Sequence, residues 1–270
     1  MSFEGKRVLA LESRRAPEIA ELIRRQGGEP FVAPSMREVP IEENAALTDF
    51  AERLFDGDFD MMTLLTGVGT RQMNRALSEA YQETAFADAL RKLTVVARGP
   101  KPVAALREMG LKPDIIAPEP NTWRELLKAT EGRPERRIAV QEYGRPNVEF
   151  LEALRARGAE VTPVRVYQYG LPEDTAPLRE AVRRLAAGAF DVAMFTTAVQ
   201  IEHLLRIAEE MGLEPAARAG LAKCMVASIG PTTTESLEEF GIHPAMEPSH
   251  PKMGMLVREA SERGSTNTHG

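Results

Sequence analysis

Six short segments combine glycine, threonine and arginine, residue types that bind anions through backbone N–H groups, hydroxyls and guanidinium groups. They are 12–15, 66–71, 98–101, 142–145, 196–199 and 230–233. Most of them directly follow a short apolar run and precede a helical pattern. In a sheet of parallel strands such segments lie at the carboxyl ends, over helix N-termini, where α/β proteins bind ligands. We therefore expect two facing sets of loops that form a cleft lined with anion-binding groups.

The elements that position these segments follow from the apolar periodicity. Short apolar runs predict strands at 8–11, 31–33, 60–65, 93–97, 114–116, 137–140, 161–167, 191–195 and 224–228. Helical spacing between them predicts helices, for example one beginning near Gln72 and one from Val103, and Asn121 is expected to cap another. Strict alternation of strands and helices, with strands apolar on both sides, predicts parallel sheets covered on both faces.

The chain also repeats itself. Residues 59–113 align without a gap on residues 190–244, at an offset of 131, with 17 identities over 55 positions. The opening segments at 6–12 and 136–142 are similar at an offset of 130. This period is much longer than a solenoid repeat, so the sequence predicts two copies of one domain.

Composition excludes several classes of protein. The net charge is −6, which argues against a general nucleic-acid binder. No apolar run approaches the length of a membrane span, and the first residues carry no signal-peptide pattern, so we expect a cytoplasmic protein. Cys224 is the single cysteine, and we expect a buried, inert thiol. The four histidines lie on separate segments without ligand spacing, so no metal site is expected.

The motifs together resemble those of the uroporphyrinogen-III synthase family. The resemblance rests on Ser13-Arg14-Arg15 after the first strand, the loops at 65–69 and 195–197, Val166-Tyr167, and Ile-Gly-Pro-Thr-Thr at 229–233 followed by Leu237 and Gly241. It covers about residues 5–262. The chain departs from the commonest pattern at 66–69, where Thr-Gly-Val-Gly replaces a Thr-Ser loop, and at 98–101, where positive charge is added.

The resemblance implies two flavodoxin-like α/β domains, each with a parallel sheet between helices, joined by a two-stranded linker. It further implies an internal duplication with a swap of segments between the copies. Residues 1–34 plus 170–262 would form one discontinuous domain, and 38–166 the other. The polar residues 263–270 are expected to be a disordered tail.

The activity implied by the resemblance is cyclisation of the linear tetrapyrrole hydroxymethylbilane to uroporphyrinogen III. Water is lost and ring D is inverted through a spiro intermediate, without a cofactor. The implied partners are this small-molecule substrate and hydroxymethylbilane synthase, which would hand it over. Neither nucleic acid nor membrane is expected as a partner, and we expect a monomer.

The resemblance also implies which residues form the site. Tyr167 is expected to assist departure of the substrate hydroxyl through a hydrogen bond, although a purely structural tyrosine at a strand end is the alternative. The residues expected to contact substrate are Arg14, Thr66, Gly67, Val68, Arg98, Gly99, Lys101, Tyr143, Gly144, Arg145, Thr197, Ala198, Gly230, Thr232 and Thr233. For the threonines, plain helix capping is the alternative, and for the cations, ordinary solvated charge.

Two other classes of function stay open at this point. A non-catalytic sensor of tetrapyrroles or other anions would use the same scaffold, and so would a solute receptor that closes around an anion. No DNA-binding motif fits after residue 262, and the lack of a signal-peptide pattern disfavours a periplasmic receptor.

Overall fold

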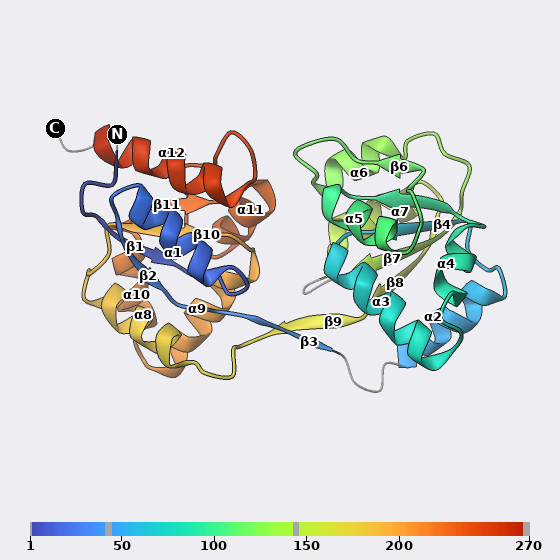
Figure 1. Cartoon of the computed structure of the whole chain (residues 1–270), viewed down its shortest axis with the longest axis horizontal. Coiled ribbons are helices and arrows are strands. Elements are labelled where there is room, and N and C mark those ends of the chain that lie inside the picture. The colour runs from blue at the N-terminus through green and yellow to red at the C-terminus, as the bar shows by residue number, and fades with distance from the viewer. Residues whose placement is uncertain (1, 41–44, 143–145, 267–270) are drawn as a thin grey trace. The chain divides into compact units, whose positions relative to one another are not determined.

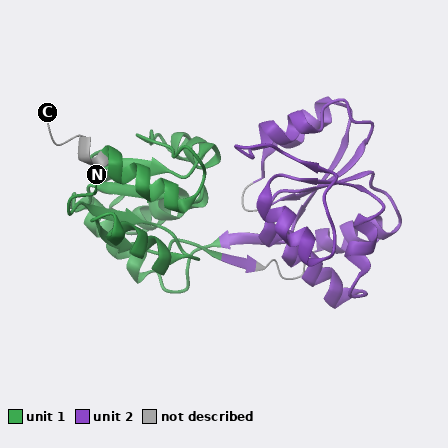
Figure 2. Cartoon of the chain, turned by 45° about the horizontal axis from the view of Figure 1, so that its top comes forward, with its two compact units in different colours: residues 1–37, 170–270 green, residues 38–169 purple. Residues whose placement is uncertain are grey.

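The computed structural model describes residues 2–40, 45–142 and 146–266. The chain forms two compact units, Met1–Arg37 with Gly170–Gly270, and Glu38–Tyr169, called unit 1 and unit 2 below (Figure 2). Unit 1 is therefore built from both ends of the chain, and unit 2 from its middle. Among the described helices, none has the length and apolar character needed to cross a membrane.

Unit 1 contains a four-stranded sheet in the order β11-β10-β1-β2, with every neighbouring pair parallel. Its strands are β1 Arg7–Ala10, β2 Glu29–Val32, β10 Val192–Phe195 and β11 Met225–Ser228. Its helices are α1 Ala16–Arg25, α8 Ala176–Ala186, α9 Val199–Glu210, α10 Glu214–Leu221, α11 Pro231–Glu239 and α12 Met253–Thr266 (Figure 1). Successive strand residues enter different cores: Leu9 packs with residues of α8, α9 and α10, whereas Val8 packs with residues of α1 and α12. Both faces of the sheet are thus buried under helices.

Unit 2 contains a five-stranded parallel sheet in the order β6-β5-β4-β7-β8. Its strands are β4 Met61–Leu64, β5 Thr94–Ala97, β6 Ile115–Ile116, β7 Arg137–Glu142 and β8 Glu160–Arg165. Its helices are α2 Ala45–Phe55, α3 Gly67–Ala80, α4 Ala85–Leu90, α5 Pro100–Glu108, α6 Trp123–Ala129 and α7 Val148–Ala156. Met62 faces the core of α2 to α5, and its neighbour Met61 faces that of α6 and α7. The predicted α/β class with helix-covered parallel sheets is confirmed, while the duplication and the segment swap stay predictions.

The chain passes between the units at two places, and these two segments pair as a two-stranded sheet of β3 Arg37–Pro40 and β9 Tyr167–Gly170. On the unit 1 side the first crossing is anchored at Ser35, which is fully buried. The Ser35 hydroxyl donates to the Leu11 carbonyl at 3.0 Å, and the Ser35 carbonyl lies 2.7 Å from Nδ1 of His203. Burial lowers the pKa of His203, which favours the neutral imidazole as the donor to that carbonyl.

Several element boundaries differ from those predicted. α3 begins at Gly67 rather than near Gln72, because Thr66 is its N-cap, and α5 begins at Pro100 rather than Val103. α6 is capped by Thr122 in a capping box with Glu125, and not by Asn121, whose φ is +61°. Proline is favoured in the first turn of a helix, which explains the early start of α5.

The C-terminal segment also differs from the prediction. α12 continues to Thr266, past the point where a disordered tail was expected to begin. Ser261, in its last part, is fully buried, and its hydroxyl lies 2.6 Å from the Arg258 carbonyl and 3.2 Å from Oε1 of Gln26. The contact with Gln26 attaches the last part of the helix to the residue that follows α1.

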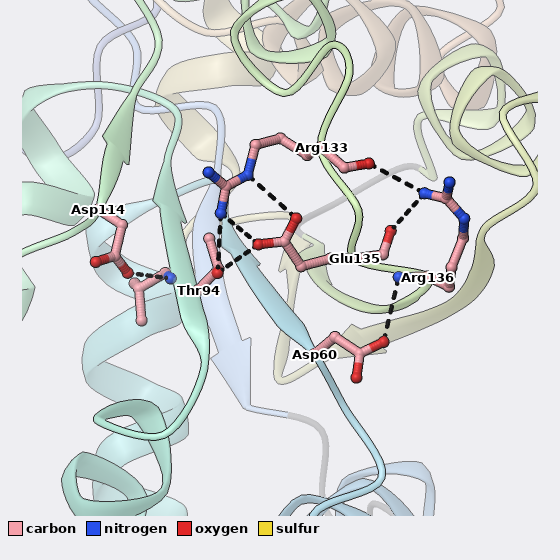
Figure 3. Close-up of polar contacts among 7 residues, drawn as sticks. Asp60, Thr94, Asp114, Arg133, Glu135 and Arg136 are labelled. Atoms are coloured by element: carbon pink, nitrogen blue, oxygen red, sulfur yellow. Dashed lines mark hydrogen bonds and ion pairs between the residues drawn. The ribbon is translucent and has the colours of Figure 1, made fainter.

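At the amino ends of the strands in unit 2, polar side chains tie neighbouring segments together (Figure 3). Thr94 donates its hydroxyl to Glu135 at 2.6 Å, and Arg133 forms an ion pair with the same carboxylate. Asp60 accepts from the backbone N–H groups of Arg136 and Arg137, at 3.2 and 2.9 Å. The Asp60 carboxylate also pairs with the Arg137 guanidinium at 2.6 Å, so the residue before β4 is joined to the first residue of β7.

The Asp60 contacts predict a pH-dependent contribution to stability. Hydrogen bonds from the Arg137 side chain and backbone lower the pKa of Asp60 from 3.8 to about 2. A carboxylate with a lowered pKa stabilises the fold above its unfolded pKa and loses that contribution as the pH falls through the folded value. We expect Asp60→Asn to lower the free energy of unfolding at neutral pH by about 1 kcal/mol, because the pair is partly exposed to solvent. The difference from wild type should shrink between about pH 4 and about pH 2.

Denaturant unfolding at a series of pH values measures this difference. Asp56→Asn is the matched control, since Asp56 is exposed on the same unit. A difference between Asp60→Asn and wild type that stays constant down to about pH 2 would contradict the assignment.

Candidate functional site

In unit 2 the loop between β4 and α3 is ordered around Thr66. Its backbone is extended, and its Oγ1 accepts from the Gly69 N–H at 3.0 Å, which caps α3. The Thr70 hydroxyl donates to the Thr66 carbonyl at 2.8 Å. Thr66 is half-buried at the carboxyl edge of the sheet, so its side chain remains accessible, whereas Gly67, Gly69 and Thr70 in the first turn of α3 are buried. This is the arrangement in which a helix N-terminus binds anions.

A second group, Gln141, fixes the same loop from the neighbouring strand β7. Its Oε1 accepts from the Thr66 backbone N–H at 3.0 Å and lies 3.4 Å from the Thr66 hydroxyl oxygen. Its Nε2 donates to the Glu142 carbonyl at 2.6 Å. Gln141 is fully buried, so the amide takes the place of water for these backbone groups.

Tyr167 lies behind Thr66. It is the first residue of β9, its ring is fully buried, and its phenol oxygen is 3.2 Å from Oγ1 of Thr66. The Tyr169 ring packs edge-on against it at 5.5 Å. The sequence predicted that the phenol itself would reach the substrate, whereas this geometry brings it to Thr66.

The glycines of this region permit close approach of α3 and α5. A Cβ atom on Gly67 would lie 2.5 Å from the Lys101 carbonyl oxygen, and one on Gly99 would lie 2.8 Å from the side-chain amide of Asn121. The Arg98 backbone N–H donates to the Leu64 carbonyl at 3.0 Å, so the loop after β5 starts beside the loop after β4. The structure thereby brings together the predicted residues Thr66, Gly67, Val68, Arg98, Gly99 and Lys101. Arg98 is half-buried and the Lys101 side chain is exposed.

In unit 1 the loop between β10 and α9 contains Thr196, Thr197 and Ala198. Gln200, which is buried, accepts through Oε1 from the backbone N–H groups of Thr196 and Thr197, at 2.7 and 3.2 Å. Its Nε2 donates to the Leu11 carbonyl at 2.9 Å and to the Thr196 hydroxyl at 3.0 Å. The two predicted residues Thr197 and Ala198 are half-buried at the end of this loop.

Glu12 links this loop to the one after β1. One carboxylate oxygen accepts from the Thr196 hydroxyl at 2.5 Å, and the other accepts from the Arg14 and Arg15 backbone N–H groups at 3.0 and 3.1 Å. The Arg14 side chain is exposed, as a cation for a ligand must be, and Arg15 forms an ion pair with Glu18. The structure therefore connects Arg14 to the threonine loop through Glu12.

The Gly-Pro-Thr-Thr segment at 230–233 begins α11. Gly230 is its N-cap, with an extended backbone, so Thr232 and Thr233 lie in the first helical turn and neither is the cap. Thr232 is exposed, but Thr233 is 4% exposed, which leaves its side chain little surface for a ligand. The Ser236 hydroxyl donates to the Ala198 carbonyl at 3.1 Å, so α11 lies against the threonine loop of unit 1.

Three predicted residues, Tyr143, Gly144 and Arg145, lie outside the described part of the chain. The residue before them, Glu142, is 3% exposed, and burial raises the pKa of its carboxyl although Arg165 opposes the shift. Glu142 accepts from the Asn147 N–H at 3.3 Å, and Asn147 caps α7 through a bond to the Phe150 N–H at 2.9 Å.

Neither a metal centre nor a reactive thiol stands out in the residues that the structure describes. Within these ranges no three His, Cys, Asp or Glu side chains group together as metal ligands. Cys224 lies with its sulfur 3.3 Å from the carbonyl oxygens of Phe190 and Gly220, and burial raises the pKa of its thiol to about 11. A thiol with so high a pKa is a weak nucleophile at neutral pH.

The sequence interpretation missed Glu12, Gln141 and Gln200, the groups that organise both loops. A signal was present for Gln141, because it is a polar side chain inside the otherwise apolar run 138–141. A buried amide in such a strand needs hydrogen-bond partners, and the adjacent strand end is where free backbone N–H groups occur.

The chain is similar to known proteins over most of its length. A family model described as "Uroporphyrinogen-III synthase HemD" matches residues 17–258. A Bacillus subtilis (strain 168) protein named "Uncharacterized protein YjjA" is 28% identical over 264 residues, which is 96% of each chain. A protein of Methanothermobacter thermautotrophicus named "Putative uroporphyrinogen-III synthase" is 32% identical over 231 residues, 84% of this chain and 87% of that protein.

A solved structure is also similar along its full length. The crystal structure of a mutant uroporphyrinogen III synthase from the extremely thermophilic bacterium Thermus thermophilus superposes with a TM-score of 0.74 at 26% identity. The match covers 97% of this chain and 99% of that one. The similarity therefore includes both units and not a single shared domain.

The contact between α3 and α5 predicts the effect of enlarging Gly67. Because a Cβ atom there would lie 2.5 Å from a backbone oxygen, Gly67→Ala should force the two helices apart and lower the free energy of unfolding by about 1 to 3 kcal/mol. Gly254→Ala is the control, because this α12 glycine has open space around it and alanine is favoured in a helix. Urea unfolding of both variants measures the difference, and equal stability of the two would show that the helices do not approach so closely.

Proposed function

The chain belongs to the uroporphyrinogen-III synthase family, and from this membership we propose that it closes hydroxymethylbilane to uroporphyrinogen III. It is an enzyme of tetrapyrrole biosynthesis. The observation that carries the proposal is the family match, which extends over 17–258 and so includes strand-end loops of both units, although the loop after β1 at 12–15 precedes it. The cyclisation loses water and leaves the oxidation level of the pyrrole carbons unchanged, so we propose that it needs no cofactor.

The substrate is a linear chain of four pyrroles that carries eight carboxylates. The net charge of the protein is −6, so binding has to depend on local groups and not on the overall charge. We propose that the carboxylates are bound by the backbone N–H groups, hydroxyls and cations at the carboxyl edges of the two sheets. In unit 2 these groups are Thr66, Gly67, Val68, Arg98, Gly99 and Lys101 together with the predicted Tyr143, Gly144 and Arg145. In unit 1 they are Arg14, Thr197, Ala198, Gly230 and Thr232, with Thr233 supporting the turn.

The first chemical step removes the substrate hydroxyl. As its C–O bond breaks, the oxygen takes up a proton and leaves as water, and the remaining carbon becomes part of an electron-poor azafulvene. Ring D then attacks that carbon through its substituted α-carbon, which forms the new C–C bond of a spiro intermediate. The older bond from this ring D carbon to the bridge carbon of ring C breaks. The bridge carbon then bonds to the free α-carbon of ring D, which loses a proton, so ring D is inverted. Since the linear substrate also closes unaided to the other isomer, the main task of the enzyme is to hold ring D in the reactive geometry.

We propose that Thr66 and Tyr167 assist the departure of the hydroxyl together. Thr66 is accessible, and its hydroxyl donates to the leaving oxygen, while the buried phenol of Tyr167 donates to Oγ1 of Thr66 at 3.2 Å. A hydroxyl that accepts one hydrogen bond becomes a better donor for the next. In this arrangement Tyr167 acts through Thr66.

Three further properties are part of the proposal. The enzyme works as a monomer in the cytoplasm, and it receives hydroxymethylbilane from hydroxymethylbilane synthase. Transfer between two enzymes would limit the time in which the free substrate closes to the wrong isomer. The single cysteine is compatible with a reducing compartment.

Product analysis tests the function. The purified protein is mixed with hydroxymethylbilane, and the products are oxidised and separated into isomers I and III. Isomer III in proportion to the amount of enzyme supports the proposal. Isomer I alone, at the rate of the protein-free reaction, would refute catalysis even if the substrate binds.

The hydrogen bond between Tyr167 and Thr66 predicts a moderate loss of rate. Tyr167→Phe keeps the ring in its apolar core but removes the phenol, so we expect kcat to fall about tenfold, corresponding to one hydrogen bond to the reacting hydroxyl. KM should change little, because the buried phenol does not touch the substrate. Tyr169→Phe is the control in the same cluster. Wild-type kcat in a folded Tyr167→Phe protein would eliminate the assisting role.

A further inference from the structure

We infer that Gln141 and Gln200 are positioning residues that perform the same task in the two units. Gln141 extends to its loop from a neighbouring strand, and Gln200 from the helix that follows its loop. Each places a buried amide under a threonine loop and holds the backbone N–H group that leaves the strand. The inference rests on the proposed function, since it assigns these loops to substrate binding. It adds two residues that touch the loops and not the substrate.

The two glutamines are not equivalent in the repeat. At the offset of 131, Gln200 aligns with Gly69, and at the offset of 130 that relates the opening segments, Gln141 aligns with Leu11. In unit 1 the amide therefore comes from the helix after the loop, α9, and the strand position holds leucine. In unit 2 it comes from the neighbouring strand, β7, and the helix position holds glycine.

We call this an exchange: the amide is supplied by the strand position in unit 2 and by the helix position in unit 1. Steric constraints in unit 2 support it. A Cβ atom on Gly69 would lie 2.1 Å from Nε2 of Gln141, so the space that a helix side chain would use is filled by the amide from the strand. In unit 1 the Leu11 side chain is buried in the apolar core, and its carbonyl accepts from Nε2 of Gln200. Each unit thus contains one amide at this place, and in unit 2 a helix side chain would collide with it.

The hydrogen bonds of the side-chain amide explain why each loop needs one. A backbone N–H group at the end of a central strand has left the sheet ladder, and a buried one without an acceptor is costly. Gln200 accepts from two such groups and also donates to the Thr196 hydroxyl. That hydroxyl donates to Glu12, which in turn accepts from the Arg14 backbone, so the amide fixes the loops after both β10 and β1. In unit 2 the corresponding amide fixes Thr66.

Moving the amide of unit 2 from the strand position, Gln141, to the helix position, Gly69, tests the exchange. In unit 2, Gln141→Leu removes it, Gly69→Gln adds a second side chain to a filled space, and the double variant reproduces the arrangement of unit 1. We expect each single variant to unfold at a lower urea concentration than wild type, and the double variant to be more stable than either. Gln82→Leu, at an exposed position of the same unit, is the control for adding leucine. If the double variant loses as much free energy of unfolding as the two single variants together, or more, the exchange is overturned, because the two positions then do not share one site.

Kinetics distinguish positioning from general support of the fold. For Gln141→Leu, at a temperature where the protein is folded, we expect KM to rise about tenfold and the share of isomer III to fall at matched total turnover. The double variant should recover both. Wild-type KM and isomer share in a folded Gln141→Leu protein would overturn the positioning role.

Gln200→Leu provides the same measurement in unit 1 and covers the case in which the unit 2 variants do not fold. If wild type itself forms no isomer III, the proposed function fails, and the stability cycle still decides the exchange. If wild type is active and neither glutamine variant changes KM or isomer share, the inference alone is overturned.

Discussion

Both units depend on one constraint, the need to satisfy backbone N–H groups where a strand leaves a parallel sheet and a helix begins. The sheet ladder ends at this point, and the first N–H groups of the helix have no intrahelical partner. In unit 2 the acceptors are the Thr66 hydroxyl and the Gln141 amide, and in unit 1 they are Gln200 and Glu12. Gln141 and Gln200 are buried beneath the loops, and Thr66 and Glu12 are half-buried within them, so the acceptors fix the direction in which each loop presents its remaining donors.

A rigid set of neutral donors suits a reaction that proceeds without an enzyme to the wrong product. Such an enzyme gains little from a strong nucleophile or base, and much from holding one ring of the substrate in place. The described strand-end loops contain threonines, glycines and backbone N–H groups with a few cations, and their buried acidic residue Glu142 holds the Asn147 backbone. We therefore propose that loop geometry, rather than one reactive group, selects the isomer.

The sequence was sufficient for the fold class and for the location of the loops, because both follow from local patterns. Successive residues such as Val8 and Leu9 are both apolar although they point to opposite sides of the strand, which indicates a covered parallel sheet, and they enter two separate cores. It was insufficient for helix starts, since Gly67 and Pro100 look like loop residues although Thr66 and Gly99 precede regular helices. Which side chains face a ligand depends on tertiary packing: Thr232 and Thr233 are neighbours, yet one is exposed and the other is buried.

The amide exchange shows why such details resist prediction from a repeat. Alignment of the two halves treats Gly69 and Gln200 as a mismatch, and Leu11 and Gln141 as another. In space the two mismatches compensate, because the volume freed at the helix position is occupied from the strand. What the two units share is a polar group at one place in the loop and not a residue at one aligned position in the chain. A physical requirement, here an acceptor for a buried N–H group, can therefore persist while the residue that meets it moves to a different element.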